Sequence, residues 1–315
     1  MAGILCFPEL SLRHRPELFE ALVSHPFEDA LVEARFGHRR GWVVLDPLTA
    51  RGLLLRRDVP KGRSAASREV VGGYPSLTGA DFYHARSEVM VALARASTDT
   101  AAMSSSLKET IGAVSPLRRV APAAYTRWML HDLAGGKSTP IDLEILTEGV
   151  TAVTTDVEAA QAGEPSASGV ARARDALICG LTERIDNENT VFLAELRSRG
   201  WSTSRIVNEL IGLAVAGWES TAAAVGTAQA LGMGSSPTSA EVSELLRLYP
   251  PSWLIVRQLT GDELWGAAGD LALVSPWLTH RSPVWRDAAR FDPERTDSVA
   301  AFPFGVGSRR CPCRS

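Results

Sequence analysis

Near the end of the chain, glycines and arginines surround a cysteine, and this loop constrains the fold more than any other feature. Residues 304–311 read Phe-Gly-Val-Gly-Ser-Arg-Arg-Cys. A thiol binds a metal only as a thiolate, and neighbouring guanidinium charges lower the pKa of a thiol. The glycines let the backbone approach a flat partner closely. Cys311 is therefore a candidate metal ligand, although a lone loop of this kind is more often an ordinary turn with an idle thiol.

The composition is that of a globular protein. The chain has 315 residues, of which 45% are hydrophobic and 22% charged, and its formal net charge is -3. It lacks the basic excess of proteins that bind nucleic acids or anionic membranes non-specifically. Four scattered cysteines are too few for a disulfide framework, and neither a signal peptide nor a membrane span is evident. We expect a soluble, cytoplasmic protein.

Short apolar runs far apart in the sequence predict a small β region. Residues 41–47 have the β-branched and aromatic content of a strand that ends at a proline. Similar runs lie at residues 253–256 and 271–274. The strands must therefore come from distant segments.

The rest of the chain has the apolar spacing of helices. Residues 144–158 and 170–185 carry this pattern. The longest helix is predicted to begin near Ser202, a good N-cap, and to continue to about Leu231, before Gly232. The expected fold class is mainly α with a small β region.

Polar residues interrupt the apolar face of this long helix. Residues 216–221 read Ala-Gly-Trp-Glu-Ser-Thr. A buried carboxylate must be paired or hydrated, and a glycine within a helix costs about 1 kcal/mol relative to alanine. The segment is either an exposed stripe at a harmless bend, or a place where Gly217 opens space for a ligand and Glu219 and Ser220 relay protons.

Glu244 and Arg247 are spaced three residues apart, so they lie on one face of a predicted helix. On a surface helix such a pair contributes only a few tenths of a kcal/mol. The spacing alone therefore has no functional meaning. The Tyr-Pro-Pro that follows at residues 249–251 ends the helix.

Taken together and in this order, these segments resemble the cytochrome P450 family. The loop matches the family pattern Phe-Gly-x-Gly-x-Arg-x-Cys-x-Gly except at its last position, which is Cys313. Residues 216–221 resemble the oxygen-activation motif, and Glu244-x-x-Arg247 resembles the motif of the K-helix. The resemblance implies a single domain over residues 1–315 with the P450 fold of soluble bacterial members. Because four residues follow Cys311, we expect a truncated form with a shortened lid and without the C-terminal helix and hairpin.

The resemblance also implies a role for each matching residue. Cys311 is the expected axial ligand of the iron of haem b. The other expected cofactor-binding residues are Arg309, Arg257, His84, Phe304, Gly305, Ala216 and Gly217. Glu219, Ser220 and Thr221 are the expected catalytic residues, and Glu244, Arg247 and Arg295 a buried structural network. Glu88 stands where the family has a propionate-binding arginine, and Arg86 is a possible substitute.

The implied activity is hydroxylation of a small apolar substrate, a terpenoid or another secondary metabolite. The reaction uses dioxygen and electrons from NAD(P)H, delivered by a ferredoxin reductase and a ferredoxin, and the protein is expected to be a monomer. The alternative is a truncated, catalytically inactive relative that binds haem or has only a structural role. Intact Cys311, Glu219 and the pair Glu244 and Arg247 favour the enzyme.

Overall fold

The computed structural model describes most of the chain. The described residues are 5–7, 30–36, 39–62, 73–96, 133–135, 140–162, 168–234, 236–297 and 301–311. Cys313 therefore lies outside them. The chain divides into two compact units, one made of Met1–Arg63 with Thr227–Arg314 and the other of Ser64–Gly226. The single domain expected over residues 1–315 stays a prediction.

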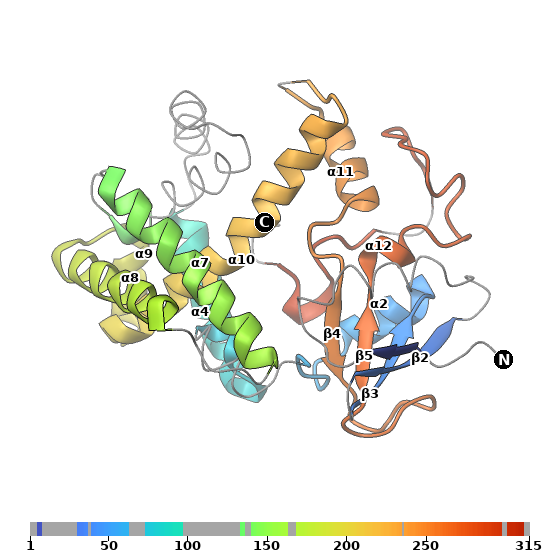
Figure 1. Ribbon diagram of the computed structural model, residues 1–315, viewed down its shortest axis with the longest axis horizontal. Coiled ribbons are helices and arrows are strands. Elements are labelled where there is room, and N and C mark those ends of the chain that lie inside the picture. Colours follow the sequence, from blue (N-terminus) through green and yellow to red (C-terminus); the bar gives the residue numbers. More distant parts are fainter. Residues whose placement is uncertain are drawn as a thin grey trace. The chain divides into compact units, whose positions relative to one another are not determined.

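A five-stranded mixed sheet forms the centre of the first unit (Figure 1). Its order is β1-β2-β3-β5-β4, and the strands are Leu5–Phe7, Leu31–Phe36, Arg39–Val44, Leu271–Val274 and Ile255–Gln258, respectively. β3 pairs in parallel with β5, with Gly41 opposite Leu271. The other neighbours of these two strands, β2 and β4, are antiparallel to them. The predicted β region built from distant segments is confirmed.

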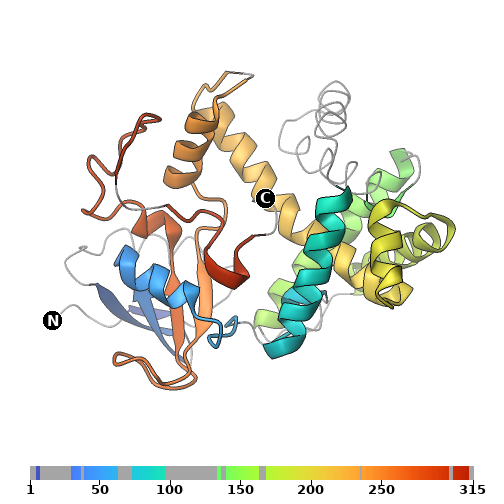
Figure 2. The same cartoon turned by 180° about the vertical axis from the view of Figure 1, so that it is seen from behind.

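Both faces of the interior strand β5 are buried. Leu271 and Leu273 point into one apolar cluster, and Ala272 and Val274 into the other, as the alternation of a strand requires. The second cluster includes helix α2, Pro47–Leu55, which covers this face of the sheet (Figures 1 and 2). All four residues of the strand are therefore apolar.

Two further helices in the first unit are fixed by side-chain caps. α11, Ser239–Leu248, begins with a capping box in which Thr238 and Glu241 satisfy each other's backbone N–H groups. The short helix α12, Pro276–Thr279, is capped by Ser275. A single 3-10 turn, η5, Gly307–Arg309, lies just before Cys311.

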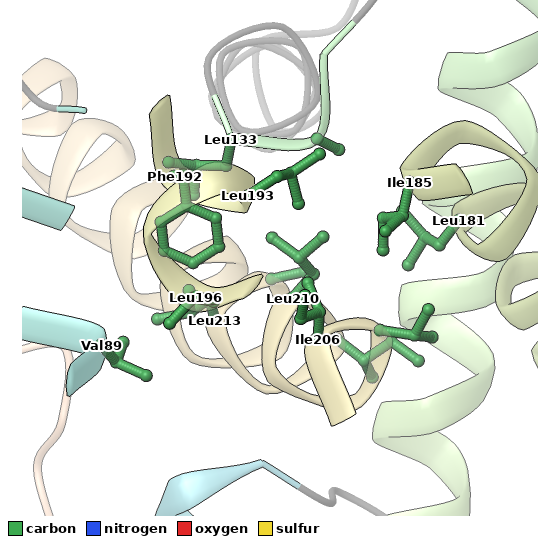
Figure 3. Packing of buried hydrophobic residues seen from close by; sticks show 14 of the residues in the cluster. Val89, Leu133, Leu181, Ile185, Phe192, Leu193, Leu196, Ile206, Leu210 and Leu213 are labelled. Carbon is green, nitrogen blue, oxygen red and sulfur yellow. The ribbon is translucent and has the colours of Figure 1, made fainter. Parts of the chain in front are cut away.

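The second unit consists of helices packed around one core. They are α4, Gly79–Ala96, α7, Pro140–Ala162, α8, Ser168–Asn187, α9, Val191–Ser198, and the first part of α10, Thr203–Ala230 (Figure 1). A 3-10 turn, η2, Tyr74–Ser76, precedes α4. Side chains from these helices meet in Figure 3, among them Ile185, Phe192, Ile206 and Leu210, and Leu133 from outside these helices joins them; each is no more than 1% exposed.

The long helix α10 begins and ends close to where the sequence predicts. The Ser202 hydroxyl accepts a hydrogen bond from the Arg205 N–H at 3.3 Å, which caps the helix. Gly232 has a φ of 67°, a conformation that a glycine adopts without strain after a helix. The boundary between the two units falls within this helix, after Gly226.

The fold class predicted from the sequence is confirmed. α7 and α8 contain the two shorter helices predicted from apolar spacing, at residues 144–158 and 170–185. Among the described residues, none of the helices combines the length and the apolar character that crossing a membrane requires.

We expect Leu273→Ala to lower the free energy of unfolding by about 2 to 5 kcal/mol, because it leaves a cavity in a strand buried on both faces. Leu264→Ala is the matched control, since Leu264 is 105% exposed and Leu273 is 0% exposed. The control should change stability by less than about 0.5 kcal/mol. Chemical denaturation followed by circular dichroism measures both, and equal effects would contradict the assigned packing.

Candidate functional site

Two backbone hydrogen bonds shape the cysteine loop. The Gly305 N–H donates to the Phe302 carbonyl, and the Cys311 N–H donates to the Phe304 carbonyl, both at 2.8 Å. Gly305 has a φ of 68°, in the left-handed region that disfavours larger residues. The second bond folds the chain back on itself, so Cys311 lies beside the start of its own loop with its side chain partly exposed.

Gly307 is required by both its backbone and its surroundings. Its φ is 73°, and a Cβ atom there would lie 2.7 Å from the Leu54 carbonyl oxygen at the end of α2. That distance is too short for any side chain, and the obstacle is backbone that cannot rotate away. The loop therefore rests directly on α2, and only glycine permits this approach.

Apolar contacts anchor the loop to the sheet. Phe302, 1% exposed, belongs to the cluster that includes Val44, Ala272 and Val274, and Val306 packs against the same cluster. Between them, Phe304 is half-buried and Gly305 is buried. The polar residues that follow in the loop therefore extend from a backbone segment that these apolar contacts hold in place.

Glu244 and Arg247 form a buried, bidentate ion pair. The Arg247 Nε donates to Oε2 of Glu244 at 2.7 Å, and one terminal nitrogen donates to Oε1 at 2.8 Å. Arg295 also donates to Oε1, at 3.3 Å, and the Asp292 N–H does so at 3.0 Å. The structure thus brings together the three residues predicted to form a network.

The two guanidinium groups also order the irregular segment at residues 280–297. Arg247 donates to the carbonyls of His280 at 2.6 Å, Ala288 at 2.9 Å and Arg290 at 3.2 Å. Arg295 donates to the carbonyls of Arg286, Asp287 and Arg290, and to the Asp297 carboxylate. Buried carbonyls outside helices and strands need such donors, and arginine supplies five in a fixed geometry.

The charge state of Glu244 follows from these contacts. Burial by itself raises the pKa of a carboxyl group. Here the hydrogen bonds from Arg247 and the Asp292 N–H, with the charges of Arg247 and Arg295, outweigh burial and hold the pKa of Glu244 below its ordinary value. Glu244 is therefore an anion at neutral pH.

His280 connects this network to the cysteine loop, and the sequence analysis gave it no role. Its Nδ1 lies 3.0 Å from the Arg247 carbonyl oxygen, and its Nε2 accepts a hydrogen bond from the Phe302 N–H at 2.9 Å. Burial, together with the charges of Arg247 and Arg281, lowers the pKa of His280 to about 4. The imidazole is neutral at physiological pH.

The polar segment of α10 is helical throughout. Gly217 is buried, Ala216 is exposed, and Ser220 and Thr221 are half-buried. The Ser220 hydroxyl donates to the Ala216 carbonyl at 2.8 Å. The side chain of Glu219 lies outside the described part of the chain.

On α4, His84 is exposed, and its Nε2 lies 3.5 Å from a carboxylate oxygen of Glu88. Glu88, where the resemblance implies an arginine, is 7% exposed and accepts a hydrogen bond from the Trp201 indole N–H at 2.8 Å. Its carboxylate thus joins two elements of the second unit. Arg86 donates to the Tyr74 hydroxyl at 3.1 Å.

Arg257, predicted to bind a haem propionate, lies on β4 and is 6% exposed. One terminal nitrogen of its guanidinium donates to the carbonyl of Val256 at 3.2 Å. The preceding Ile255 is next to the cysteine loop, because its Cδ1 would lie 3.7 Å from a Cβ at Gly305. Arg309, in η5, is half-buried.

The predicted site residues fall into two groups, one in each unit. The first unit holds Cys311, its loop, Arg257, Arg309 and the network around Glu244. The second unit holds the polar segment of α10 and His84. The sequence marked both groups, whereas the contacts of His280 and Glu88 join residues 22 and 113 positions apart and had no sequence signal.

The family model for cytochrome P450 matches residues 238–314. The match begins at the cap of α11 and includes the network and the cysteine loop. This part of the chain therefore matches the cytochrome P450 family, whose characteristic cofactor is haem.

The chain is similar to bacterial proteins of this family. It is 26% identical to the cyclooctat-9-en-7-ol 5-monooxygenase of Streptomyces melanosporofaciens over 375 aligned positions, which cover 96% of this chain and 81% of that protein. It is also 39% identical to the pentalenene oxygenase of Streptomyces avermitilis over 89 residues, which cover 24% of this chain and 20% of that protein.

Solved structures share the fold. The chain superimposes on the cytochrome P450 enzyme CxnD for C-S bond formation in chuangxinmycin biosynthesis with a TM-score of 0.77 and 15% identity, covering 100% of this chain and 86% of that one. With the mycinamicin VIII C21 methyl hydroxylase of Micromonospora griseorubida the TM-score is 0.72 at 18% identity, covering 99% and 88%.

We expect Gly307→Ala to destabilise the protein more than Gly232→Ala. Both glycines have left-handed backbones, with φ of 73° and 67°, so both substitutions incur the strain of about 1 to 2 kcal/mol. Only Gly307 meets backbone, because nothing lies within 4 Å of a Cβ at Gly232. Urea denaturation distinguishes the two, and an equal loss would show that the loop does not rest on α2.

We expect the free energy of unfolding to fall as the pH drops from about 6.5 to about 4. In this range the unfolded chain protonates His280 but the folded protein, with its pKa of about 4, does not. The slope is at most about 1.4 kcal/mol per pH unit. The contribution of the Glu244 carboxylate to stability is lost only below its ordinary pKa of 4.5. Most of the pH range in which His280 affects stability lies above that value.

Denaturation at pH 7, 6 and 5 measures this slope, and His280→Gln is the comparison because it removes the titrating group. The variant should depend less on pH than the unaltered chain. If the free energy of unfolding depended equally on pH in both proteins, the imidazole would not be buried in its neutral form.

Proposed function

We propose that this chain is a haem-dependent monooxygenase that hydroxylates a small apolar molecule, with Cys311 as the residue that would hold the iron of haem b. The observation that carries the proposal is the loop that ends at Cys311. The hydrogen bond from the Cys311 N–H to the Phe304 carbonyl and the contact of Gly307 with Leu54 fix the backbone conformation of this loop. A thiolate on a fixed, glycine-lined loop is the donor that haem-thiolate chemistry requires.

The residues present fit this cofactor. Gly305 and Gly307 have left-handed backbones, and Gly307 lies directly against α2, so the loop follows a tight path to Cys311 that larger residues would not permit. When bound, the haem supplies the activation of dioxygen. The protein's own contribution is to hold the sulfur in place and to support the loop through Arg247 and His280.

We assign the haem propionates to Arg257, Arg309 and His84. Arg257 is buried in β4, and a guanidinium pairs well with a carboxylate in such surroundings. His84 offers an exposed imidazole on α4. Because the Glu88 carboxylate accepts a hydrogen bond from Trp201, we exclude Glu88 from this role.

We assign proton delivery to Glu219, Ser220 and Thr221, and the space beside the cofactor to Ala216 and Gly217. Ser220 already donates its hydroxyl proton to the Ala216 carbonyl. Its oxygen keeps lone pairs that can accept a proton from a neighbour. The proposed relay requires the hydroxyl to turn from this carbonyl, so that it donates its own proton toward the cofactor as it accepts one from the carboxyl group of Glu219.

For the substrate we propose a terpenoid or another secondary metabolite. The support comes from the names of the similar bacterial proteins, a monooxygenase of cyclooctat-9-en-7-ol and an oxygenase of pentalenene. We propose that a ferredoxin and its reductase supply the electrons and that residues 1–315 act as one functional domain.

We expect Cys311→Ala to abolish the strongly red-shifted Soret band of the reduced, carbon monoxide-treated protein, because that band reports a thiolate on the iron. Cys179→Ala is the control, since Cys179 lies exposed on α8 and should leave the band intact. If the unaltered chain took up haem but did not show this band, it would be a haem-binding protein without thiolate ligation. No uptake would reject the proposal.

We expect Ser220→Ala to lower the yield of hydroxylated product per electron consumed, because it removes the relay hydroxyl. A loss of about 10²-fold or more in the rate of product formation is within the range of general acid catalysis. Ser220→Thr keeps a hydroxyl and should retain most of the yield. Product analysis with reconstituted reductase and ferredoxin measures the ratio, and equal yields from the two variants would remove Ser220 from the proposed relay.

A further inference from the structure

The imidazole of His280 is held by two hydrogen bonds whose directions are fixed. The Arg247 carbonyl oxygen, 3.0 Å from Nδ1, can only accept, and the Phe302 N–H, 2.9 Å from Nε2, can only donate. The ring must therefore carry its proton on Nδ1 and have a free lone pair on Nε2. A second proton would remove the acceptor that Phe302 uses.

Aromatic side chains keep the ring in this orientation. Phe302 lies 4.8 Å from it, centroid to centroid, with an angle of 75° between the planes, and Trp285 lies 5.9 Å away at 70°. Trp285 is itself fixed, since its indole N–H donates to the Thr279 carbonyl at 3.1 Å. His280 is 0% exposed, so no water competes for its nitrogens.

The two hydrogen bonds of His280 connect the network around Glu244 with the cysteine loop, which are far apart in the sequence. On one side, the carbonyl belongs to Arg247, whose guanidinium binds Glu244. On the other side, Phe302 lies two residues before the loop, and its carbonyl accepts the hydrogen bond from Gly305. The charged groups near the ring are Arg247, Arg281 and Glu244.

We propose that His280 is a positioning residue that sets the place of the Cys311 loop relative to the Glu244 and Arg247 network. The bond to Phe302 fixes the segment that leads into the loop, and the bond from the Cys311 N–H to the Phe304 carbonyl transmits that position to the sulfur-bearing residue. The consequence for the thiolate ligand rests on the proposed function, whereas the coupling of the loop does not.

Substituting His280 by asparagine or by glutamine keeps one of the two hydrogen bonds of the imidazole and removes the other. The shorter side chain of His280→Asn places its amide near the position of Nδ1, where it can donate to the Arg247 carbonyl but cannot reach Phe302. The longer side chain of His280→Gln places its amide near Nε2, where its oxygen can accept from the Phe302 N–H. His280→Asn should therefore release the loop, and His280→Gln should retain it.

Hydrogen exchange of the protein without haem is the primary measurement. In His280→Asn we expect the amides of residues 302–311 to exchange about tenfold faster than in the unaltered chain, the effect of one lost hydrogen bond. Those of β5 should be unchanged, and His280→Gln should stay within about threefold. Equal loop exchange in the two variants, or equal acceleration at β5, would overturn the proposal.

Nitrogen chemical shifts of His280 in the unaltered, folded protein give a test that does not depend on a variant folding. We expect the Nδ1-protonated neutral ring at pH 7, and protonation on Nε2 or on both nitrogens would overturn the proposal.

A second readout uses the haem-loaded protein. His280→Asn should convert part of the red-shifted carbon monoxide band to a band at shorter wavelength, and His280→Gln should not. If the unaltered chain takes up no haem, the proposed function fails while exchange and chemical shifts still decide the role of His280. If both variants keep the full band, the link from His280 to the sulfur is wrong.

Discussion

The buried pair of Glu244 and Arg247 is the interaction on which the first unit depends. Neither charge can be buried alone, because each loses its hydration. Their bidentate contact leaves part of each group free, and the backbone uses these parts: the carboxylate accepts from the Asp292 N–H, and the guanidinium donates to three carbonyls. One ion pair therefore organises a segment with almost no regular secondary structure.

The cysteine loop is supported from two sides. On one side it lies against α2, where the backbone of Leu54 leaves no space for a side chain at Gly307. On the other side His280 binds the Phe302 N–H, with Phe302 packed in the apolar cluster of the sheet. Steric exclusion and hydrogen bonding act together, so contacts within the protein itself define the backbone path to Cys311.

The sequence predicted the features that repeat or match a pattern. The helices α7, α8 and α10 follow from apolar spacing, and β3, β4 and β5 from short β-branched runs. The resemblance also marked Glu244, Arg247 and Arg295 as a group, which the structure brings together.

The sequence could not show contacts that depend on one close approach between distant segments. Nothing in the pattern around Leu54 indicates that its carbonyl faces Gly307, and nothing around Glu88 indicates Trp201. The function of His280 depends on which atoms its two nitrogens meet, and these belong to Arg247 and Phe302, which are distant in the sequence. The role of Cys311 stays a prediction, since its assignment rests on the motif and on the shape of the loop.

The pairing of β3 with β5 has a consequence for synthesis of the protein. These neighbours join Gly41 to Leu271, whereas the second unit is one continuous stretch, Ser64–Gly226. Domains fold as their residues emerge from the ribosome, and pairings between distant strands form late. We therefore expect the helical unit to form first, while β3, already paired with β2, keeps its other edge exposed to chaperones until residues 271–274 have been synthesised.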